Sequence, residues 1–440
     1  METTQIDSPI TINDNNDAVN SDKLHVASTN SFDDIDDIDL DSYLLQIPLN
    51  LYGALLSFYN TILFIPDRLL KQVRDVYCKV LEDLLSSINN VIYWKRFLLL
   101  PVILLSNKDR EIMKLHLDKV KNNLWEFKVR DFINYDSLLP SRKQSKHSYP
   151  SKCIANGQLS KAMNVISRSR VSFDPSSMPV KQLLEEKHPQ HNYPITEEEM
   201  EILRSFKVQE EHKIFVDGME IRRIIQNSKK MIRPGLDKLR YEHLKALVGR
   251  NVEPSASEIR FTTLFGELVA VILNGDIPES VACVIRDNEL IAIPKSDSDI
   301  RPIGIGSTIR KVASMVAFNR LREFNKKYFS KFQYGSNKNG GERIIHDIRF
   351  RRDQHPSHDF YAIDGVNAFN NANRLIGLQQ VLSKTPQVFA FVREMYLSSS
   401  NGWYYGPDMT YPIKSVNGFH QGDFGILVVY PYNISVITKH

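Results

Sequence analysis

The chain has 440 residues, of which 42% are hydrophobic and 25% charged, and its formal net charge is +4. The length predicts more than one domain, and the composition is typical of a globular protein, which excludes collagen-like, coiled-coil and disulfide-scaffold classes. The three cysteines, Cys78, Cys153 and Cys283, form no Cys-x-x-Cys pair, so the pattern argues against a cysteine-based zinc site and a thioredoxin-type centre.

The charge is distributed unevenly along the chain. Residues 1–45 contain eleven acids and one base, a net charge of −10, so the other 395 residues carry +14. Residues 1–41 are also poor in aromatic residues, and we expect them to form a disordered acidic tail. The basic remainder indicates a polyanionic partner such as nucleic acid, or a solvated surface with a slight basic bias. The chain begins without a basic and apolar signal, which predicts an intracellular protein, cytoplasmic or nuclear and not secreted.

Residues 42–135 have the pattern of a helical N-terminal region. Within it, residues 42–66 carry no charge and are long enough to span a bilayer. Pro48, Asn50 and other polar residues interrupt this stretch, so a buried amphipathic helix is favoured over a membrane span. Further along, apolar residues recur at the helical spacing, at Val73, Val76, Val80, Leu84 and Ile88.

Residues 136–194 are predicted to be a basic linker with short helices. Its basic blocks, at 141–146 and 167–170, either bind a phosphate backbone or are solvated linker charges. From 195 to 440 the patterns alternate between helix and strand. The elements expected there are helices within 196–230, a hairpin at 289–305, helices at 307–324 and 341–352, a strand at 359–364 and a helix directly after it.

The candidate chemistry begins at Asp364, which ends the predicted short strand. A carboxylate at such a position needs a cation, and Mg²⁺, which takes oxygen ligands, is one candidate. The alternative is that Asp364 caps the next helix. Upstream, Lys295 and Arg301 flank the hairpin turn and can reach a triphosphate held by that metal. Downstream, a Gln-Gly-Asp run contains Gly422, whose lack of a side chain permits close approach to a ligand.

Five runs of the sequence, in this order, resemble the reverse transcriptase domain of non-LTR retrotransposons. The resemblance covers roughly residues 195–423 and is carried by RPGLDKLRYEHLKAL (233–247), LIAIPKSDSDIRPIGIGSTIRKV (290–312), FQYGSNKNGGERIIHDIR (332–349), FYAIDGVNAFN (360–370) and HQGD (420–423). It implies an α+β fold, a right-hand polymerase of fingers, palm and thumb, of which this chain has the fingers and part of the palm. The implied activity is RNA-directed DNA synthesis with two magnesium ions, in which a primer 3′-hydroxyl attacks a nucleotide α-phosphate and releases pyrophosphate. The implied partners are an RNA template, a primer and deoxynucleoside triphosphates.

The resemblance also assigns roles to individual residues. Asp364 is the first catalytic metal ligand, and the backbone carbonyl of Gly365 is a further metal ligand. Phe369 is the steric gate that excludes a ribose 2′-hydroxyl, although as a large apolar residue it can also belong to the core. Lys295 and Arg301 hold the incoming triphosphate, although exposed hairpin charges are often only solvated. The nascent base pair is lined by Gln421 and Gly422.

Departures from the family pattern predict a chain that is inactive as a polymerase. Phe424 stands where the family has proline, and no aromatic-x-Asp-Asp motif or thumb follows Asp423. Two-metal catalysis needs carboxylates on both sides of the ion pair, so we expect a C-terminally truncated, retrotransposon-derived protein with an incomplete magnesium site. One alternative is a non-catalytic nucleic-acid-binding protein derived from a retroelement. A membrane-associated protein anchored by residues 42–66 is a further alternative, which the polar interruptions disfavour.

Overall fold

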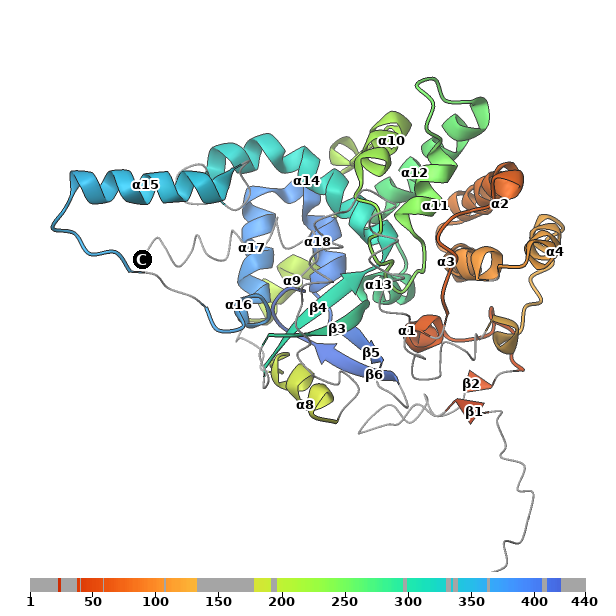
Figure 1. The fold of residues 1–440 in the computed structure, drawn as a ribbon, viewed down its shortest axis with the longest axis horizontal. Helices are drawn as coiled ribbons and strands as arrows, with labels where there is room; N and C mark the ends of the chain where they lie inside the picture. The colour runs from red at the N-terminus through yellow and green to blue at the C-terminus, as the bar shows by residue number, and fades with distance from the viewer. Residues whose placement is uncertain are drawn as a thin grey trace, which may run out of the picture.

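The computed structural model describes residues 23–24, 38–39, 41–57, 59–106, 108–132, 178–190, 196–295, 299–329, 334, 339–361, 365–405 and 410–420. Most of the predicted acidic tail and of the basic linker therefore lies outside the described residues, as do both basic blocks. A two-stranded ribbon pairs β1 (Lys23–Leu24) with β2 (Ile38–Asp39). Figure 1 shows the remaining elements arranged around one small sheet.

The sheet has four strands in the order β4-β3-β5-β6. β3 (Asn288–Pro294) and β4 (Ile300–Gly306) form an antiparallel hairpin, which confirms the hairpin predicted at 289–305. β5 (Ser400–Tyr405) runs parallel to β3 and pairs antiparallel with β6 (Thr410–Ser415). Sequence segments more than a hundred residues apart thus form one sheet.

Helices cover both faces of this sheet (Figure 1). On one face lies α8 (Met178–Glu186), whose Val180 and Leu184 form a small core with apolar residues of all four strands. The predicted linker therefore contributes a helix that packs on the sheet. Trp403 of β5 is fully buried against α1 (Tyr52–Ser57), where a side-chain carbon on Gly53 would collide with the indole ring.

The remaining helices belong largely to one main core, an apolar cluster that runs from Leu44 to Phe419. The N-terminal helices in it are α2 (Asp67–Ser86), α3 (Val91–Leu105) and α4 (Arg110–Lys121). The later ones are α9 (Glu197–Ser205), α10 (Gly218–Asn227), α11 (Tyr241–Val248), α12 (Ala256–Leu273), α13 (Glu279–Arg286), α14 (Thr308–Phe329), α17 (Arg374–Lys384) and α18 (Phe389–Tyr396). Short 3-10 turns lie at Leu49–Leu51, Val129–Phe132, Glu210–His212 and Pro386–Val388.

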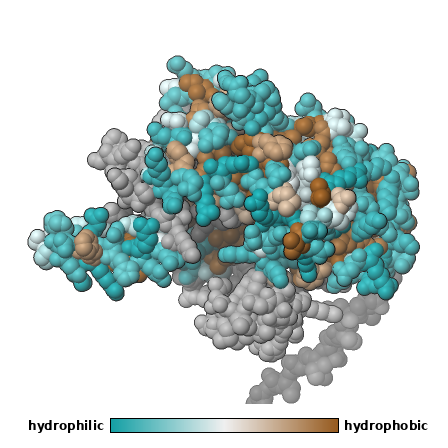
Figure 2. All heavy atoms as spheres, turned by 90° about the horizontal axis from the view of Figure 1, so that it is seen from above, coloured by the Kyte–Doolittle hydropathy of each residue, from teal (hydrophilic) through white to brown (hydrophobic). Residues whose placement is uncertain are grey.

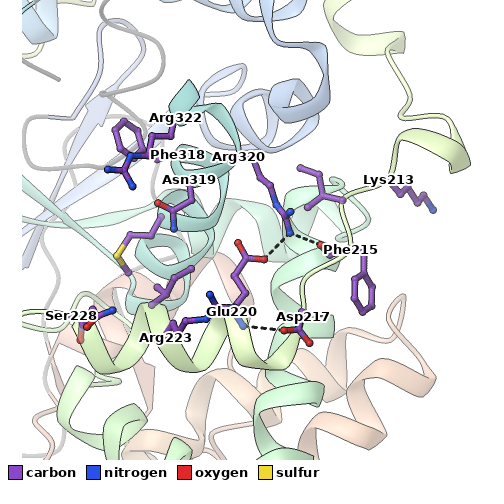
Figure 3. A pocket seen from close by; sticks show the side chains of 14 residues that line it. Lys213, Phe215, Asp217, Glu220, Arg223, Ser228, Phe318, Asn319, Arg320 and Arg322 are labelled. Carbon is purple, nitrogen blue, oxygen red and sulfur yellow. Dashed lines mark hydrogen bonds and ion pairs between the residues drawn. The ribbon is translucent and has the colours of Figure 1, made fainter. Parts of the chain in front are cut away.

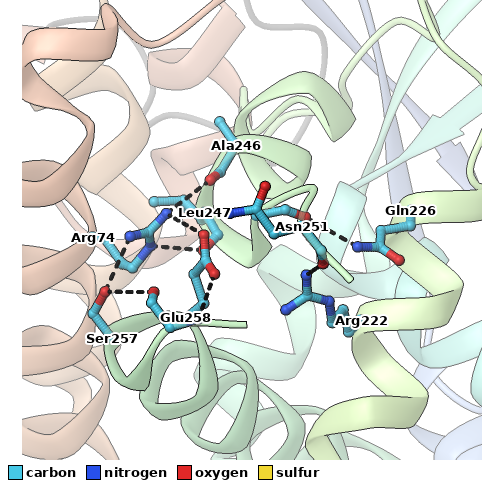
Figure 4. A network of polar contacts seen from close by, with 10 residues as sticks. Arg74, Arg222, Gln226, Ala246, Leu247, Asn251, Ser257 and Glu258 are labelled. Carbon is cyan, nitrogen blue, oxygen red and sulfur yellow. Dashed lines mark hydrogen bonds and ion pairs between the residues drawn. The ribbon is translucent and has the colours of Figure 1, made fainter. Parts of the chain in front are cut away.

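The helical N-terminal region is joined to the rest of the chain by the packing of α2 on α12. Val73, Val76, Val80 and Leu84 of α2 are buried, as their spacing predicted. Arg74 of the same helix is buried as well; it donates to the carbonyl oxygens of Leu247 (2.8 Å) and Ala246 (3.1 Å) at the end of α11 and lies 3.3 Å from Glu258 Oε1 (Figure 4). Polar and apolar contacts therefore connect this region to residues 241–273.

The uncharged stretch at 42–66 differs from its prediction. Among the described residues of this stretch, only 49–57 are helical, as a 3-10 turn followed by α1, so the expectation of one amphipathic helix over the whole stretch is wrong. Pro48 and Pro66 stand at helix boundaries because proline cannot continue a hydrogen-bonded helix from the preceding turn. The apolar side chains are buried nevertheless, among them Tyr52, Leu55 and Leu56. Within the described part of the chain, no helix is both long and apolar enough to cross a membrane.

The predicted helices at 307–324 and 341–352 are confirmed by α14 and by α15 (Gly340–Gln354). The helix predicted after residue 364 is present as a short α16 (Ala368–Asn371) followed by α17. The strand predicted at 359–364 is not formed in its described part, since residues 359–361 are irregular and exposed. A strand needs an adjacent strand that pairs with its backbone N–H and C=O groups. The alternation of apolar residues in this segment did not reveal whether such a strand lies beside it.

Candidate functional site

The two cations predicted at the hairpin turn are both at the surface. Arg301 is exposed on β4, opposite Ile293 of β3. Lys295 follows β3, and its Nζ lies 3.3 Å from the Asp299 carboxylate on the other side of the turn. The prediction that these cations flank one turn is confirmed, and an acid lies between them.

A third cation reaches the same turn from the residue that follows α8. Lys187 Nζ lies 2.7 Å from Asp299 Oδ1. The hydrogen bond from Lys187, with a smaller contribution from Lys295, holds the pKa of Asp299 below its usual range. Lys187, Lys295 and Arg301 thus lie at a turn whose sequence contains two acids, Asp297 and Asp299, of which the structure describes Asp299. Three cations against two acids leave an excess of positive charge that favours an anionic ligand.

Lys187 also connects the hairpin turn to the run that follows Asp364. Its carbonyl oxygen accepts hydrogen bonds from Asn367 Nδ2 (2.8 Å) and Asn370 Nδ2 (2.7 Å). Gly365 is exposed at the start of this run. The structure therefore places the hairpin turn and residues 365–370 in one neighbourhood, although more than sixty residues separate them in the sequence.

A third segment lies beside this run. The backbone N–H of Phe419 donates to the carbonyl of Phe369 (2.8 Å), and that of Gly418 donates to Ala372 (3.1 Å). Gly418 has a φ of +64°, and a side-chain carbon there would collide with the backbone of Asn370. Phe369 itself is half-buried and packs against the main core. Asp364, Gln421 and Gly422 lie outside the described residues, so their predicted functions remain predictions.

Arg374 holds the segment that leads to Gln421. It is buried and donates to the carbonyl oxygens of Gly418 (2.9 Å) and Asn417 (3.0 Å) and to Ser415 Oγ (3.0 Å). Burial lowers the pKa of its guanidinium to about 10, which still leaves the group charged near neutral pH. The local sequence gave no signal for this buried arginine, because all three partners lie more than forty residues away, at the end of β6 and just after it.

A buried polar layer lies beneath these segments. His420 Nε2 lies 3.2 Å from Asn288 Nδ2 and 3.0 Å from Ser400 Oγ. Burial, together with the charges of Arg310 and Arg374, keeps the pKa of His420 well below its ordinary value, so the ring is neutral. The side chain before Gln421 is therefore fixed by hydrogen bonds and is not a titrating group.

The run RPGLDK at residues 233–238 contacts both the hairpin and α14. Buried Glu289 of β3 pairs with Arg233, and Lys238 Nζ lies 3.9 Å from its other oxygen. Asp237 Oδ2 accepts the N–H groups of Thr308 (2.6 Å) and Ile309 at the start of α14. This run therefore fixes the hairpin and α14 relative to each other, a function that sequence reasoning missed.

The described residues supply few oxygen ligands for a divalent metal. Among them, no group of three or more His, Cys, Asp and Glu side chains is arranged to hold an ion. Asp299, the described carboxylate of the hairpin turn, is already paired with Lys187 and Lys295. The predicted Mg²⁺ ligands therefore remain Asp364 and the Gly365 carbonyl.

A groove of about 1220 Å³ lies elsewhere, between α10 and α14 (Figure 3). Arg320 extends into it and donates to Glu220 Oε2 (2.7 Å) and to the Phe215 carbonyl (2.9 Å). None of the predicted site residues lines this groove.

The sequence matches no protein-family model. Over 118 residues it is 30% identical to the retrotransposable element SLACS 132 kDa protein of Trypanosoma brucei gambiense. The match covers 26% of this chain and 10% of that protein. This chain thus has a local similarity to a retrotransposable-element protein, which supports a retroelement origin.

Proposed function

We propose that this chain is a retroelement-derived, reverse-transcriptase-like protein that binds nucleic acid and a deoxynucleoside triphosphate. The observation that carries the proposal is the convergence of three separate runs of the resemblance: the hairpin turn, residues 365–370 and residues 418–420. Lys187 joins the first two runs, through its ion pair with Asp299 and through its carbonyl oxygen, which accepts from Asn367 and Asn370. The Phe369 carbonyl, which accepts the N–H of Phe419, joins the second run to the third. The local similarity to a retrotransposable-element protein supports the same proposal.

In this proposal the hairpin cations bind the triphosphate. Arg301 offers the planar fork that suits phosphate oxygens, and Lys295 acts as a point charge. Lys187 is a further cation, which the resemblance did not include. Phe369 lies against the sugar of the bound nucleotide. Asp364 and the Gly365 carbonyl would hold Mg²⁺, which would neutralise phosphate charge.

Nucleotide binding is tested with Arg301→Ala. Arg310 on α14 is unsuitable as a control because that side chain is buried and donates to the Arg286 carbonyl. Arg68, exposed on α2, is a better control. Loss of one charge-assisted hydrogen bond, about 1.5–3 kcal/mol, should raise the Kd for a fluorescent deoxynucleotide by roughly tenfold or more. Equal effects of Arg301→Ala and Arg68→Ala would contradict this part of the proposal.

We further propose that the polypeptide 1–440 does not extend a primer by itself. Asp364 is the only carboxylate that the resemblance assigns to the metals, and an ion pair needs ligands on both sides. Primer extension on an RNA template, with magnesium and with manganese, should give no product. Extension by the unaltered chain that is lost in Asp364→Ala would show that another carboxylate completes the site.

A second candidate is a non-catalytic nucleic-acid-binding protein, which the charge of +14 outside residues 1–45 favours. Such binding should weaken steeply with salt because phosphate contacts release counterions. Both candidates predict binding of a primed RNA template in a filter assay at about 50 mM salt. Only the first predicts that deoxynucleotides bind as well, so the two assays together separate the candidates.

A further inference from the structure

The groove between α10 and α14 is separate from the candidate nucleotide site. Its described lining includes no residue of the hairpin turn or of residues 365–370 and 418–420. The turn precedes β4, whereas α14 begins just after the other end of this strand, which spans seven residues or roughly 20 Å. Figure 2 looks down on the side of the molecule that lies at the top of Figure 1, where α10 and α14 are, and shows apolar residues among hydrophilic ones.

Apolar and aromatic side chains form part of the groove. Ile224 of α10 and Met315 and Phe318 of α14 line it and are half-buried. Phe215, in the segment before α10, lines it as well and is 74% exposed. Figure 3 shows Phe215 and Phe318 toward opposite ends of the group of lining side chains. An exposed ring offers a plane on which a base can stack.

The charged side chains of the groove leave an excess of positive charge. Its described lining contains four cations and two acids, namely Lys213, Arg223, Arg320, Arg322, Asp217 and Glu220. Both acids have partners within the protein. Asp217 accepts two backbone N–H groups at the start of α10, and Glu220 pairs with Arg320 at 2.7 Å. The carboxylates are therefore occupied, and the arginines without an acid partner determine which ligand fits.

These arginines are Arg223 of α10 and Arg322 of α14, one on each side of the groove. Both are exposed, and Arg223 donates to the Met219 carbonyl at 3.3 Å. Within the described part of the chain, neither forms an ion pair with an acid. The amides of Asn227 and Asn319 line the same groove and supply hydrogen-bond donors and acceptors.

The lining matches the parts of an unpaired nucleotide chain. Rings stack on bases, amides pair with base edges, and guanidinium groups bind phosphates. A single strand exposes the faces of its bases, whereas a duplex keeps them stacked inside. An acidic peptide would satisfy the arginines alone and would leave the exposed ring of Phe215 without a stacking partner. The combination of rings and unpaired arginines therefore favours a single strand.

We propose that the α10–α14 groove is a second nucleic-acid site, which binds an unpaired strand with a base on Phe215 and a phosphate on Arg322. The proposal rests on the nucleic-acid part of the proposed function and is independent of triphosphate binding at the hairpin turn.

The test is binding of a fluorescent oligouridylate RNA to the full chain, titrated at several salt concentrations. Phe215→Ala should raise the Kd about tenfold, as expected for the loss of one stacked base, and leave the salt dependence unchanged. Arg322→Ala should lower the slope of log Kd against log salt by about 0.7, the contribution of one phosphate contact on a single strand. The matched controls are Phe64→Ala, at a ring 53% exposed, and Arg68→Ala, at an exposed position of α2; both should leave Kd and slope unchanged.

Two further measurements locate the ligand and separate this proposal from the proposed function. Photocrosslinking with 5-iodouridine in the RNA should label residues 213–228 or 315–322, and the Kd for a fluorescent deoxynucleotide should stay the same in both groove variants. Oligouridylate binding that neither variant weakens more than its control would overturn the groove site alone, whereas an unaltered chain that binds no oligouridylate would overturn the nucleic-acid part of the proposed function as well. Equal binding of duplex RNA would show that charge alone is recognised, and equal competition by poly-L-glutamate would identify an acidic peptide as the ligand; both results overturn the proposal.

Discussion

Two ion pairs connect α2 to α12, and we predict that the one with the poorer geometry matters more for stability. Arg260 and Glu82 form two hydrogen bonds of 2.7 Å, but their side chains are 50% and 41% exposed. Arg74 and Glu258 lie 3.3 Å apart, but their side chains are only 8% and 10% exposed. Burial, and not distance, should decide the effect of substitution.

The magnitude follows from the partners that each substitution leaves behind. Arg74→Met keeps most of the aliphatic stem and removes the guanidinium, which also donates to Leu247, Ala246 and Ser257. Removing one partner of a buried pair typically costs about 3–5 kcal/mol, because the other charge stays buried without compensation. Arg260→Met should cost about 0–1 kcal/mol, because water and salt screen an exposed pair.

The assay is equilibrium unfolding in urea, compared by the transition midpoint at unchanged slope. Arg74→Met should shift the midpoint strongly in low salt and in about 1 M salt, whereas the small shift of Arg260→Met should vanish at high salt, where the Debye length is about 3 Å. Glu258→Gln combined with Arg74→Met should cost less than the sum of the single changes, because neither side chain is then left as an uncompensated buried charge. Equal shifts for Arg74→Met and Arg260→Met would refute the argument from burial.

Three further predictions concern single positions. Burial raises the pKa of Asp237 to about 6 from 3.8. The stabilisation that comes from this pKa shift is present below pH 4 and decreases by about 3 kcal/mol as pH rises to 6. Asp237→Asn, which keeps one acceptor oxygen for α14, should remove that part of the pH dependence, as measured by urea unfolding from pH 4 to 7. Gly53→Ala should lower the thermal midpoint because the new methyl group meets Trp403, at a cost of about 1–3 kcal/mol or more. Gly341→Ala has open space around it and should stabilise α15 by about 0.5–1 kcal/mol. Similar effects of the two substitutions on the thermal midpoint would argue against the collision. Arg374→Met should lower the free energy of unfolding by about 3 kcal/mol or more because it leaves buried carbonyl oxygens without donors. Proteolysis should then cleave within residues 415–420 sooner than in the unaltered chain. Unchanged cleavage would show that Arg374 does not hold this segment.

Short-range patterns in the sequence determined many of the elements. The three-to-four spacing from Val73 to Leu84 predicted α2, and the turn residues between two apolar runs predicted the β3–β4 hairpin. These predictions held because helices and hairpins are formed by residues that are close in sequence. The same hairpin pattern placed Lys295 and Arg301 on either side of one turn.

Only the tertiary structure decided which distant segments meet. Arg74 and Glu258 are 184 residues apart, and Lys187 and Asn370 are 183 residues apart, so no local pattern could reveal either contact. The strand predicted at 359–364 was not formed in its described part because a strand depends on a neighbour that its own residues do not specify. For the candidate site, the sequence determined which cations and amides are available, and the packing of α8 and the 415–420 segment decided which of them lie together. Side-chain chemistry is local information, whereas proximity across the fold depends on how the whole core packs.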